Sequence, residues 1–446
     1  MRQRDIFWFW LPLCASWLLM TAEGPVISAA INRLPNEVVM LAAQGIVVSL
    51  SVMIESPIIN MLATATALVR DRASYVVVRN FTVGWAVVLT AVTVLVAFTS
   101  FFEVVVVGWL EAPPEVAQWV RPGMQIMTLW SAAIAWRRFL QGVLIHFGQT
   151  RRVAWGTAVR LAVSGGAVWG LAHGAKSWTG VEIGVTALMA GVIAEALFAT
   201  WMVRPLFRAE LSGDVVAEGE ALSYGELFWF HLPLASTAVL TLFAQPLVAS
   251  SLARLDEPTL SLAAWPVLFQ LMLLARAAAL ALPEVVIALN KGAQSFMPLR
   301  RFMVLLGGVL TVLMVLFVFT PTADFYFLGV QDMEPHVGAL AQSTLTLFLL
   351  FPAMAAVTSW LRGLLIVRRA TQAVNVGMMV NLGVTVAILG VGLWQRWAGL
   401  PTAAVALNVA ALVEAVYLGW RTQLILPEGM VLMGGGAANG RRAMLL

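Results

Sequence analysis

The sequence predicts an all-α, polytopic membrane protein in which twelve transmembrane helices form two parallel repeats of six. Its composition is 61% hydrophobic and 11% charged, against about 25% charged residues in soluble proteins. A helix needs roughly 20 apolar residues to cross a bilayer, and each half of the chain offers six such segments. The twelve expected spans are 5–31, 38–69, 77–100, 115–147, 152–174, 180–204, 225–252, 258–289, 299–321, 335–366, 373–394 and 400–423.

The chain contains an internal duplication. The segment FWFWLPLCAS at Phe7–Ser16 recurs as FWFHLPLAST at Phe228–Thr237, 221 residues later. The same offset pairs Pro25 with Pro246, Arg33 with Arg254, Arg79 with Arg300, Pro114 with Pro335 and Gly142 with Gly363, and after a slip of two residues Glu195 pairs with Glu414. Hydrophobic bias alone does not keep one register over about 150 positions, so we interpret the halves as copies of one unit.

The domain boundaries follow from the duplication. We expect six-helix lobes at 1–205 and 225–425, joined by a polar, acidic cytoplasmic linker at 206–224. The Gly-rich tail at 426–446 is expected to be disordered. Because each half has an even number of spans, both copies enter the bilayer from the same side and are related by an axis along the membrane normal.

The positive charges predict the orientation. With the N-terminus inside, seventeen Lys and Arg residues fall on the inner side and five on the outer side, so both termini are expected in the cytoplasm. This asymmetry explains the net charge of +4 without a nucleic-acid-binding patch. We expect a monomer in a bacterial-type inner (plasma) membrane, with lipid and a small molecule as its partners and no nucleic acid.

The first and seventh spans carry matching prolines. Pro25 follows Glu23 and Gly24, and Pro246 follows Gln245. Proline inside a helix removes a backbone hydrogen bond and clashes with the preceding turn, so we expect a kink in both spans. The two kinked helices either move during function or are static bends, and the sequence leaves both hypotheses open.

The second span is about 48 Å long as a helix against a bilayer core of about 30 Å, so it must project or break. Pro57 and, in the eighth span, Pro283 are the expected kinks. Glu55 is repeated as Arg276, which predicts a carboxylate and a guanidinium at equal depth on opposite sides of the axis. This pair is a candidate interlobe gate; the alternative is that each charge is neutralised in its own half.

Charged residues inside later spans are costly, and are functional candidates by default. Arg137 and Arg138 are adjacent in the fourth span, and because neighbouring helical residues point about 100° apart, only one can face a cavity squarely. The sequence does not decide which. Arg160 and Glu195 lie at similar depth in consecutive spans, so we expect a structural ion pair.

The usual catalytic signatures do not occur in the sequence. It contains no GxxxxGK[ST], no HExxH and no GxSxG, and Cys14 is the only cysteine. We therefore expect no enzyme, no cofactor and no metal site. His231 stands where the first half has Trp10, and it is either a protonation site or a structural histidine.

Two parallel repeats of six spans, with kinked first and seventh helices, resemble the MATE and lipid-flippase (MOP) superfamily of secondary exporters. The run MLAAQGIVVSL from Met40, together with Pro12-Leu13, Asn32-Arg33 and Arg70-Asp71-Arg72, is similar to the start of the progressive ankylosis transporter family. The resemblance implies rocker-type alternating access. It also implies anions such as pyrophosphate, citrate or ATP as substrates, and Glu23 as a coupling residue of the first helix.

We therefore expect a secondary active exporter whose cavity is lined mainly by the first, second, seventh and eighth spans. The expected lining is Glu23, Glu55, Asn60, Arg137 or Arg138, Gln245, Gln270, Arg276 and Glu284. Arginine binds carboxylate and phosphate through a bidentate fork, which favours an organic or phosphate-bearing anion coupled to H⁺ or Na⁺. A multidrug or cation antiporter and a flippase for a lipid-linked precursor are the alternatives.

Overall fold

The computed structural model describes residues 2–175, 177–209, 222–290, 292–368 and 370–425. Within these ranges the regular structure is helical, apart from one isolated bridge between Asp256 and Ala398. The linker expected at 206–224 begins later than predicted, because α8 continues to Ala209. Most of that linker, and the tail expected at 426–446, lie outside the described residues.

All twelve predicted spans are present as helices. They are α1 (Gln3–Ile31); α2, η1 and α3 (Glu37–Glu55, Ser56–Ile58, Met61–Leu68); α4 (Arg72–Phe98); α5, η3 and α6 (Pro114–Ile126, Met127–Leu129, Trp130–His146); α7 (Thr150–Gly174); α8 (Gly180–Ala209); α9 and α10 (Tyr224–Leu242, Ala244–Arg254); α11 and α12 (Pro258–Leu280, Leu282–Leu289); α13 (Ala293–Phe319); α15, η5 and α16 (Pro335–Leu345, Thr346–Phe348, Phe351–Val367); α17 (Thr371–Gln395); and α18 (Gly399–Ile425). Short helices η2 (Glu103–Trp109), α14 (Thr322–Asp324) and η4 (Phe325–Val330) lie in two of the connections.

The apolar length of these helices agrees with a membrane protein. In the described part, nine helices are long and apolar enough to cross a membrane, and the bent pair Pro335–Phe348 and Phe351–Val367 makes a tenth. The two further segments, 114–146 and 150–174, carry Arg137, Arg138 and Arg160 in their interiors. The fold is the predicted all-α bundle.

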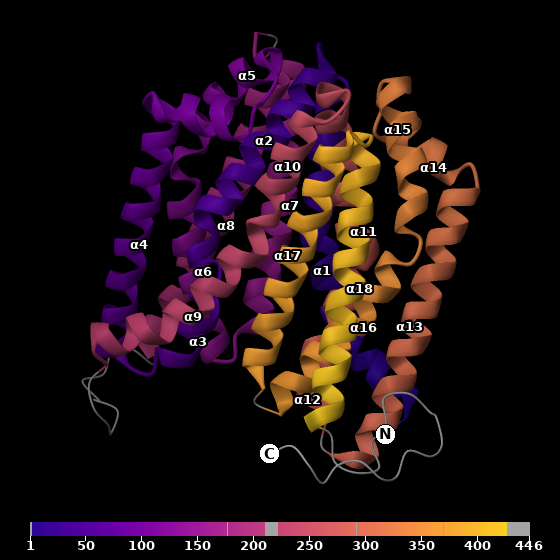
Figure 1. The fold of residues 1–446 in the computed structure, drawn as a ribbon. Helices are drawn as coiled ribbons and strands as arrows, with labels where there is room; N and C mark the ends of the chain where they lie inside the picture. Colours follow the sequence, from indigo (N-terminus) through magenta and orange to yellow (C-terminus); the bar gives the residue numbers. More distant parts are fainter. Residues whose placement is uncertain (1, 176, 210–221, 291, 369, 426–446) are drawn as a thin grey trace, which may run out of the picture.

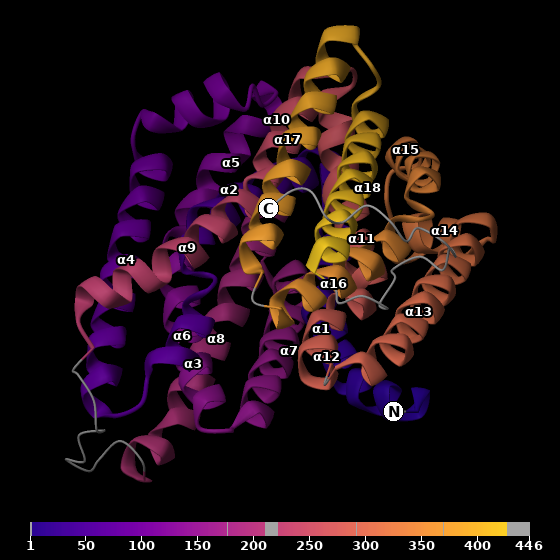
Figure 2. The same cartoon turned by 60° about the horizontal axis from the view of Figure 1, so that its bottom comes forward.

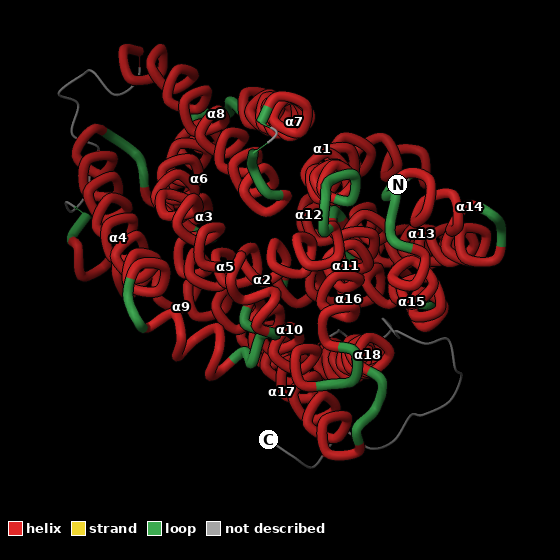
Figure 3. Tube along the Cα trace, turned by 90° about the horizontal axis from the view of Figure 1, so that it is seen from above, coloured by secondary structure: helices red, strands yellow, loops and turns green. Residues whose placement is uncertain are grey.

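The helices form two groups, which Figures 1 and 3 show side by side. We call α2–α8 with the second half of α1 the N-terminal lobe, and α10–α18 the C-terminal lobe. The helix α1 begins and α18 ends on one face of the molecule, which we call the terminal face. The short helices η2 and η4 and the starts of α5 and α15 lie at the other face, which we call the far face.

The first half of α1 packs against the C-terminal lobe, and the first half of α9 packs against the N-terminal lobe. Figure 2 shows the start of α1 beside α12 and α13, and α9 running towards α4. Trp10 Nε1 of α1 donates to the carbonyl of Ala278 at 2.8 Å, and His231 Nε2 of α9 donates to the carbonyl of Pro57 at 2.9 Å. The duplication pairs Trp10 with His231 and Pro57 with Ala278, so the two crossings are equivalent.

His231 has both ring nitrogens occupied. Because a carbonyl only accepts, Nε2 carries the hydrogen and Nδ1 accepts from the Thr64 hydroxyl at 2.8 Å. The side chain is 1% exposed. These contacts support the structural reading of His231 over a protonation site.

Three of the four expected proline kinks coincide with helix breaks. The second span breaks at η1, which contains Pro57, the seventh breaks just before Pro246, and the eighth breaks between α11 and α12 near Pro283. By contrast, α1 is one continuous helix through Pro25. Side chains of Ser28 and Gln331 contact the carbonyl of Pro25, which supports the backbone of that turn.

The lobes pack closely where α2 crosses α11. A Cβ atom on Gly45 would lie 2.5 Å from Cγ of Pro266, so only glycine allows this packing without a shift. The duplication pairs these two positions, so the contact marks the axis between the repeats. The seam between the lobes is therefore closed at this level.

Candidate substrate cavity

A cavity of about 550 Å³ lies in the C-terminal lobe, beside α2. Small-molecule sites are typically 300–1,000 Å³ and mostly apolar. Its walls come from α2 and from α9, α10, α11, α16, α17 and α18, and its aromatic side chains are Trp265, Phe269, Phe348 and Phe351. The cavity has the size and character of a small-molecule site.

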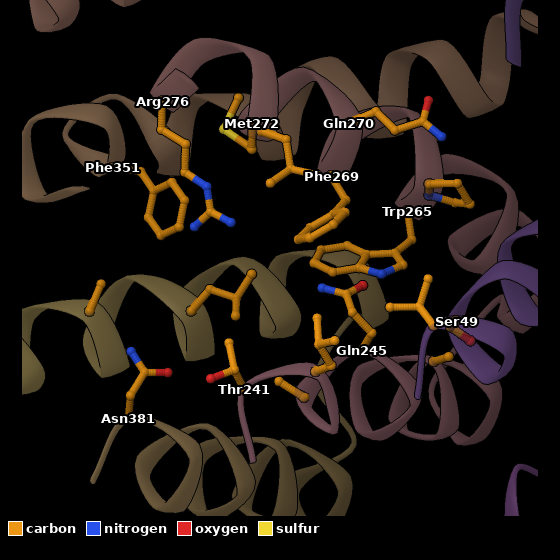
Figure 4. Close-up of a pocket in the computed structure, with 18 of the residues that line it drawn as sticks. Ser49, Thr241, Gln245, Trp265, Phe269, Gln270, Met272, Arg276, Phe351 and Asn381 are labelled. Atoms are coloured by element: carbon orange, nitrogen blue, oxygen red, sulfur yellow. The ribbon is translucent and has the colours of Figure 1, made fainter. Parts of the chain in front are cut away.

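Arg276 of α11 supplies the charge at one end of the cavity. Its guanidinium carbon lies 5.5 Å from the centroid of the Phe351 ring, and the two side chains lie side by side in Figure 4. Its Nε is buried without a hydrogen-bond partner, and in the described part of the chain no carboxylate lies within 4.0 Å of the guanidinium. Among the described residues, Arg276 therefore has no ion-pair partner.

A second arginine at the same end is neutralised. Arg362 Nε donates to Glu414 Oε1 at 3.0 Å, and its Nη2 makes a still shorter contact to the same oxygen. Asn381 Nδ2 donates to the other oxygen of Glu414 at 2.9 Å. Both oxygens of this 2% exposed carboxylate are thus engaged, and the cavity keeps one unbalanced positive charge, that of Arg276.

The other end of the cavity is aromatic with a few amides. The Trp265 and Phe269 rings are 5.5 Å apart, and Figure 4 places Gln245 and Thr241 across from them. Gln270 also lines the cavity, but its Oε1 accepts from Ser28 Oγ of α1 at 3.2 Å. The free polar groups at this end are therefore few.

Three of the predicted lining residues, Gln245, Gln270 and Arg276, line this cavity. The others, Glu23, Glu55, Asn60, Arg137, Arg138 and Glu284, do not. Asn60 Nδ2 instead donates to the carbonyl of Leu234 at 2.7 Å, and Glu284 lies on the exposed face of α12. Of the four spans expected to line the cavity, the second, seventh and eighth do so, and Gly45 and Pro266 both border it. The sequence did not predict the contribution of α16, α17 and α18.

The buried charges of the N-terminal lobe form one network. Arg160 donates to both oxygens of Glu23, from Nε at 3.0 Å and from Nη2 at 2.5 Å. Arg137 Nη1 and Gln141 Nε2 donate to the two oxygens of Glu195 at 2.8 and 2.9 Å. The predicted pair of Arg160 and Glu195 is present at 3.8 Å, although each has a closer partner.

The candidate gate residues do not meet in this structure. Glu55 is buried in the N-terminal lobe, where the charges of Arg137 and Arg138 act on it, whereas Arg276 lies over Phe351. Within the described part of the chain, Glu55 Oε2 has no hydrogen-bond partner. The surroundings of Glu55 agree with the alternative hypothesis, in which each charge is neutralised in its own half, because the arginines that act on Glu55 belong to the N-terminal lobe.

Comparison with solved structures identifies the fold. The chain superposes on an inward-facing multidrug resistance MATE family transporter with a TM-score of 0.73 at 13% identity, covering 95% of this chain and 99% of that one. An outward-facing MATE transporter gives 0.61 at 12% identity, covering 95% and 96%. The lipid II flippase MurJ, in an inward closed conformation, gives 0.70 at 11% identity, covering 94% and 87%.

The chain has the MATE fold. In sequence, no family model matches it, and neither does any curated protein. The predicted MATE-like fold is therefore confirmed, and the narrower resemblance to the progressive ankylosis family stays a prediction.

Within this MATE fold, the sequence reasoning missed several cavity residues. They are Gln44, Ser49, Trp265, Arg362, Asn381 and Glu414. The duplication held a signal for part of this set, because Glu414 repeats Glu195 and Asn381 repeats Arg160. The duplication did not indicate that the residues around Glu195 are tightly packed, whereas the equivalent residues around Glu414 border a cavity.

Proposed function

We propose that the protein is a secondary active exporter that works by alternating access and carries an organic or phosphate-bearing anion. The observation that supports this proposal is the cavity of about 550 Å³, in which Arg276 has no ion-pair partner among the described residues. Arg276 is half-buried, and a charge partly removed from water is stabilised by an opposite charge beside it. An anion bound at Arg276 supplies that pair, and a guanidinium binds carboxylate or phosphate through two parallel hydrogen bonds.

The comparisons support a transporter that is open towards the terminal face. The superposition is better on the inward-facing MATE transporter than on the outward-facing one. Arg276 lies one turn before α11 ends, so the charged end of the cavity is the end nearer the terminal face. With the termini in the cytoplasm, an anion enters from inside and is released outside.

We propose H⁺ or Na⁺ as the coupling ion, and Glu55 as the proton carrier in the first case. Both oxygens of Glu23 are held by Arg160, whereas Oε2 of Glu55 is buried and has no hydrogen-bond partner among the residues that the structure describes. A carboxylate with a free buried oxygen gains more from a proton than one that already accepts two charged hydrogen bonds.

Flux measurements in proteoliposomes test the proposal. The panel contains pyrophosphate, citrate, ATP, aromatic carboxylates and organic cations, each with and without a proton or sodium gradient. We expect anion flux from the wild type, a drop of about tenfold or more for Arg276→Gln, and no change for Arg301→Gln on the exposed face of α13. Anion flux that survives Arg276→Gln, or flux of cations alone, contradicts the assignment.

A flippase for a lipid-linked anionic precursor is the second candidate. It is supported by the TM-score of 0.70 to MurJ. Headgroup-labelled lipid in the same vesicles, probed from outside with a membrane-impermeant quencher, distinguishes it from an exporter of soluble anions.

A further inference from the structure

The charge of the cavity limits the charge of its substrate. Two arginines and one glutamate line it, and Glu414 is bound by Arg362 and Asn381, which leaves the single charge of Arg276. A second anionic group on the ligand would lie in the same cavity without a second unpaired cation to bind it. An unpaired buried charge is strongly unfavourable.

The walls of the cavity limit the body of the substrate. Trp265 and Phe269 lie 5.5 Å apart, and Phe348 and Phe351 lie 5.3 Å apart. Aromatic side chains favour flat or apolar groups, which they contact by stacking or edge-to-face packing. Several polar side chains of the cavity already donate to acceptors within the protein, which leaves fewer donors for a ligand rich in phosphate oxygens; they are Ser49, Thr241, Thr358 and Asn381.

We infer that the substrate is a monoanion with an aromatic or apolar body, and this inference rests on the proposed function. The anionic group lies at Arg276 beside Phe351, and the body extends towards Trp265. The same reasoning excludes pyrophosphate, citrate and ATP as good ligands, although they are the substrates implied by the narrower family resemblance.

Binding to the purified full chain tests the inference with naphthoate, its neutral amide naphthamide, naphthalene dicarboxylate and pyrophosphate. We expect naphthoate to bind at least about tenfold more tightly than each of the other three. Arg276→Gln should remove the preference for naphthoate over naphthamide. Phe269→Ala should weaken both of these ligands and keep the preference.

The outcomes separate this inference from the proposed function. If the dicarboxylate or pyrophosphate binds most tightly and Arg276→Gln abolishes that binding, the anion transporter stands and the monoanion inference fails. If naphthamide binds as tightly as naphthoate, both fail.

A second, independent observation concerns the far face, where an arginine of each lobe reaches the other lobe. Arg33, after α1, donates from Nη2 to the carbonyls of Gly329 and Val330 at 3.4 and 3.0 Å, and its Nε lies 3.9 Å from Asp332. The acceptors lie at and just after the end of η4, so this contact crosses the seam.

The second contact repeats the first with the lobes interchanged. Arg254, at the end of α10, donates from Nη2 to the carbonyl of Trp109 at 2.5 Å, and its Nε lies 3.0 Å from Glu111. The duplication pairs Arg33 with Arg254, Trp109 with Val330, and Glu111 with Asp332. The two contacts are therefore equivalent by descent, and both cross the seam.

The acceptor turns are built alike. Glu111 and Asp332 have φ of 51° and 52°, a left-handed conformation that is uncommon for residues other than glycine. In both turns the next residue, Ala112 or Met333, closes a backbone hydrogen bond to the preceding π-helix, at 3.1 and 3.0 Å. Each turn presents a carbonyl and a carboxylate to the arginine of the other lobe.

We infer that Arg33 and Arg254 form a double latch that holds the far face closed and opens when the transporter turns outward. The arginine side chains are 34% and 27% exposed, and the two carboxylates are more than half exposed. Ion pairs of this exposure are weak and reversible. A weak latch on each side of the axis is suited to a face that must open in every cycle.

Spin-label distances across the far face test the latch. In a Cys14→Ala background, labels at Gln118→Cys and Ala339→Cys occupy equivalent exposed sites of the two lobes. We expect Arg33→Ala/Arg254→Ala to shift the distance distribution to longer values, and each single change to produce part of the shift. Arg121→Ala is the control, because Arg121 pairs at 2.5 Å with Glu103 of its own lobe.

Exchanging the two charges of one contact distinguishes loss of the latch from general damage to the fold. Arg254→Glu should lengthen the distance, and adding Glu111→Arg should restore it. An unchanged distance in Arg33→Ala/Arg254→Ala, or the same lengthening in Arg121→Ala, overturns the latch.

Discussion

The two lobes use equivalent positions to build different interiors. In the N-terminal lobe, Arg137 and Arg138 occupy the positions that Thr358 and Ser359 occupy in the C-terminal lobe. The small cavity beside Arg137 measures only about 10 Å³, room for one water at most, against about 550 Å³ for the C-terminal cavity. Short side chains at these two positions help to leave space for a ligand.

The acidic residue of each cluster is the common element. Glu195 and Glu414 are equivalent, but Glu195 is held by Gln141 and Arg137, whereas Glu414 is held by Arg362 and Asn381. Around Glu195, three arginines accompany three glutamates, those at 23, 55 and 195, so the formal charges cancel. The duplicated lobes have thus diverged into a charge-balanced core and a positively charged site.

The largest expected effect comes from making the C-terminal lobe resemble the N-terminal one. The double change Thr358→Arg/Ser359→Arg places two long cations beside the cavity. We expect transport to fall to background in proteoliposomes. The control Thr358→Val/Ser359→Ala preserves the volume approximately and should keep most of the flux, and a double arginine variant with normal flux would contradict the comparison.

Removing the acidic residues should affect the lobes unequally. Glu195→Gln leaves Arg137 buried without its counter-ion, so we expect a loss of about 3–5 kcal/mol in the free energy of unfolding. Glu414→Gln should cost about 1 kcal/mol, because Arg362 is 29% exposed and can reach water. Thermal unfolding of both variants in one detergent measures the difference; equal losses would show that the lobes do not differ in this way.

The seam between the lobes should be sensitive to a single methyl group. Gly45→Ala places its Cβ against Cγ of Pro266, which is part of a stiff ring. We therefore expect overpacking to lower the free energy of unfolding by about 1–3 kcal/mol. Gly84→Ala is the matched control, since nothing lies within 4 Å of its added Cβ. Thermal unfolding should therefore separate the two variants.

A small difference in stability is expected between changes at the two equivalent crossings. His231→Phe removes contacts to both Thr64 and Pro57, whereas Trp10→Phe removes only the contact to Ala278. We expect losses of about 2 and about 1 kcal/mol. The same unfolding measurement gives the order, and a reversed order would assign the greater structural role to the α1 crossing.

Much of the fold could be predicted from the sequence because the signals are properties of the chain itself. The length of each apolar segment indicates a span, and the break at Pro57 follows from the missing amide hydrogen of proline. The offset between the copies predicts which positions are equivalent. That offset identified Glu55 and Arg276 as counterparts, although it could not show that they lie apart in this structure.

Side-chain partners, by contrast, depend on how each helix is rotated and which lobe it enters. A change of one residue turns a side chain by about 100°, so depth alone predicted Arg160 with Glu195 and missed the closer contact with Glu23. Nothing local indicates that α1 and α9 cross between the lobes. Which lobe contains the cavity was decided only in the tertiary structure, because that outcome depends on the packing of seven helices at once.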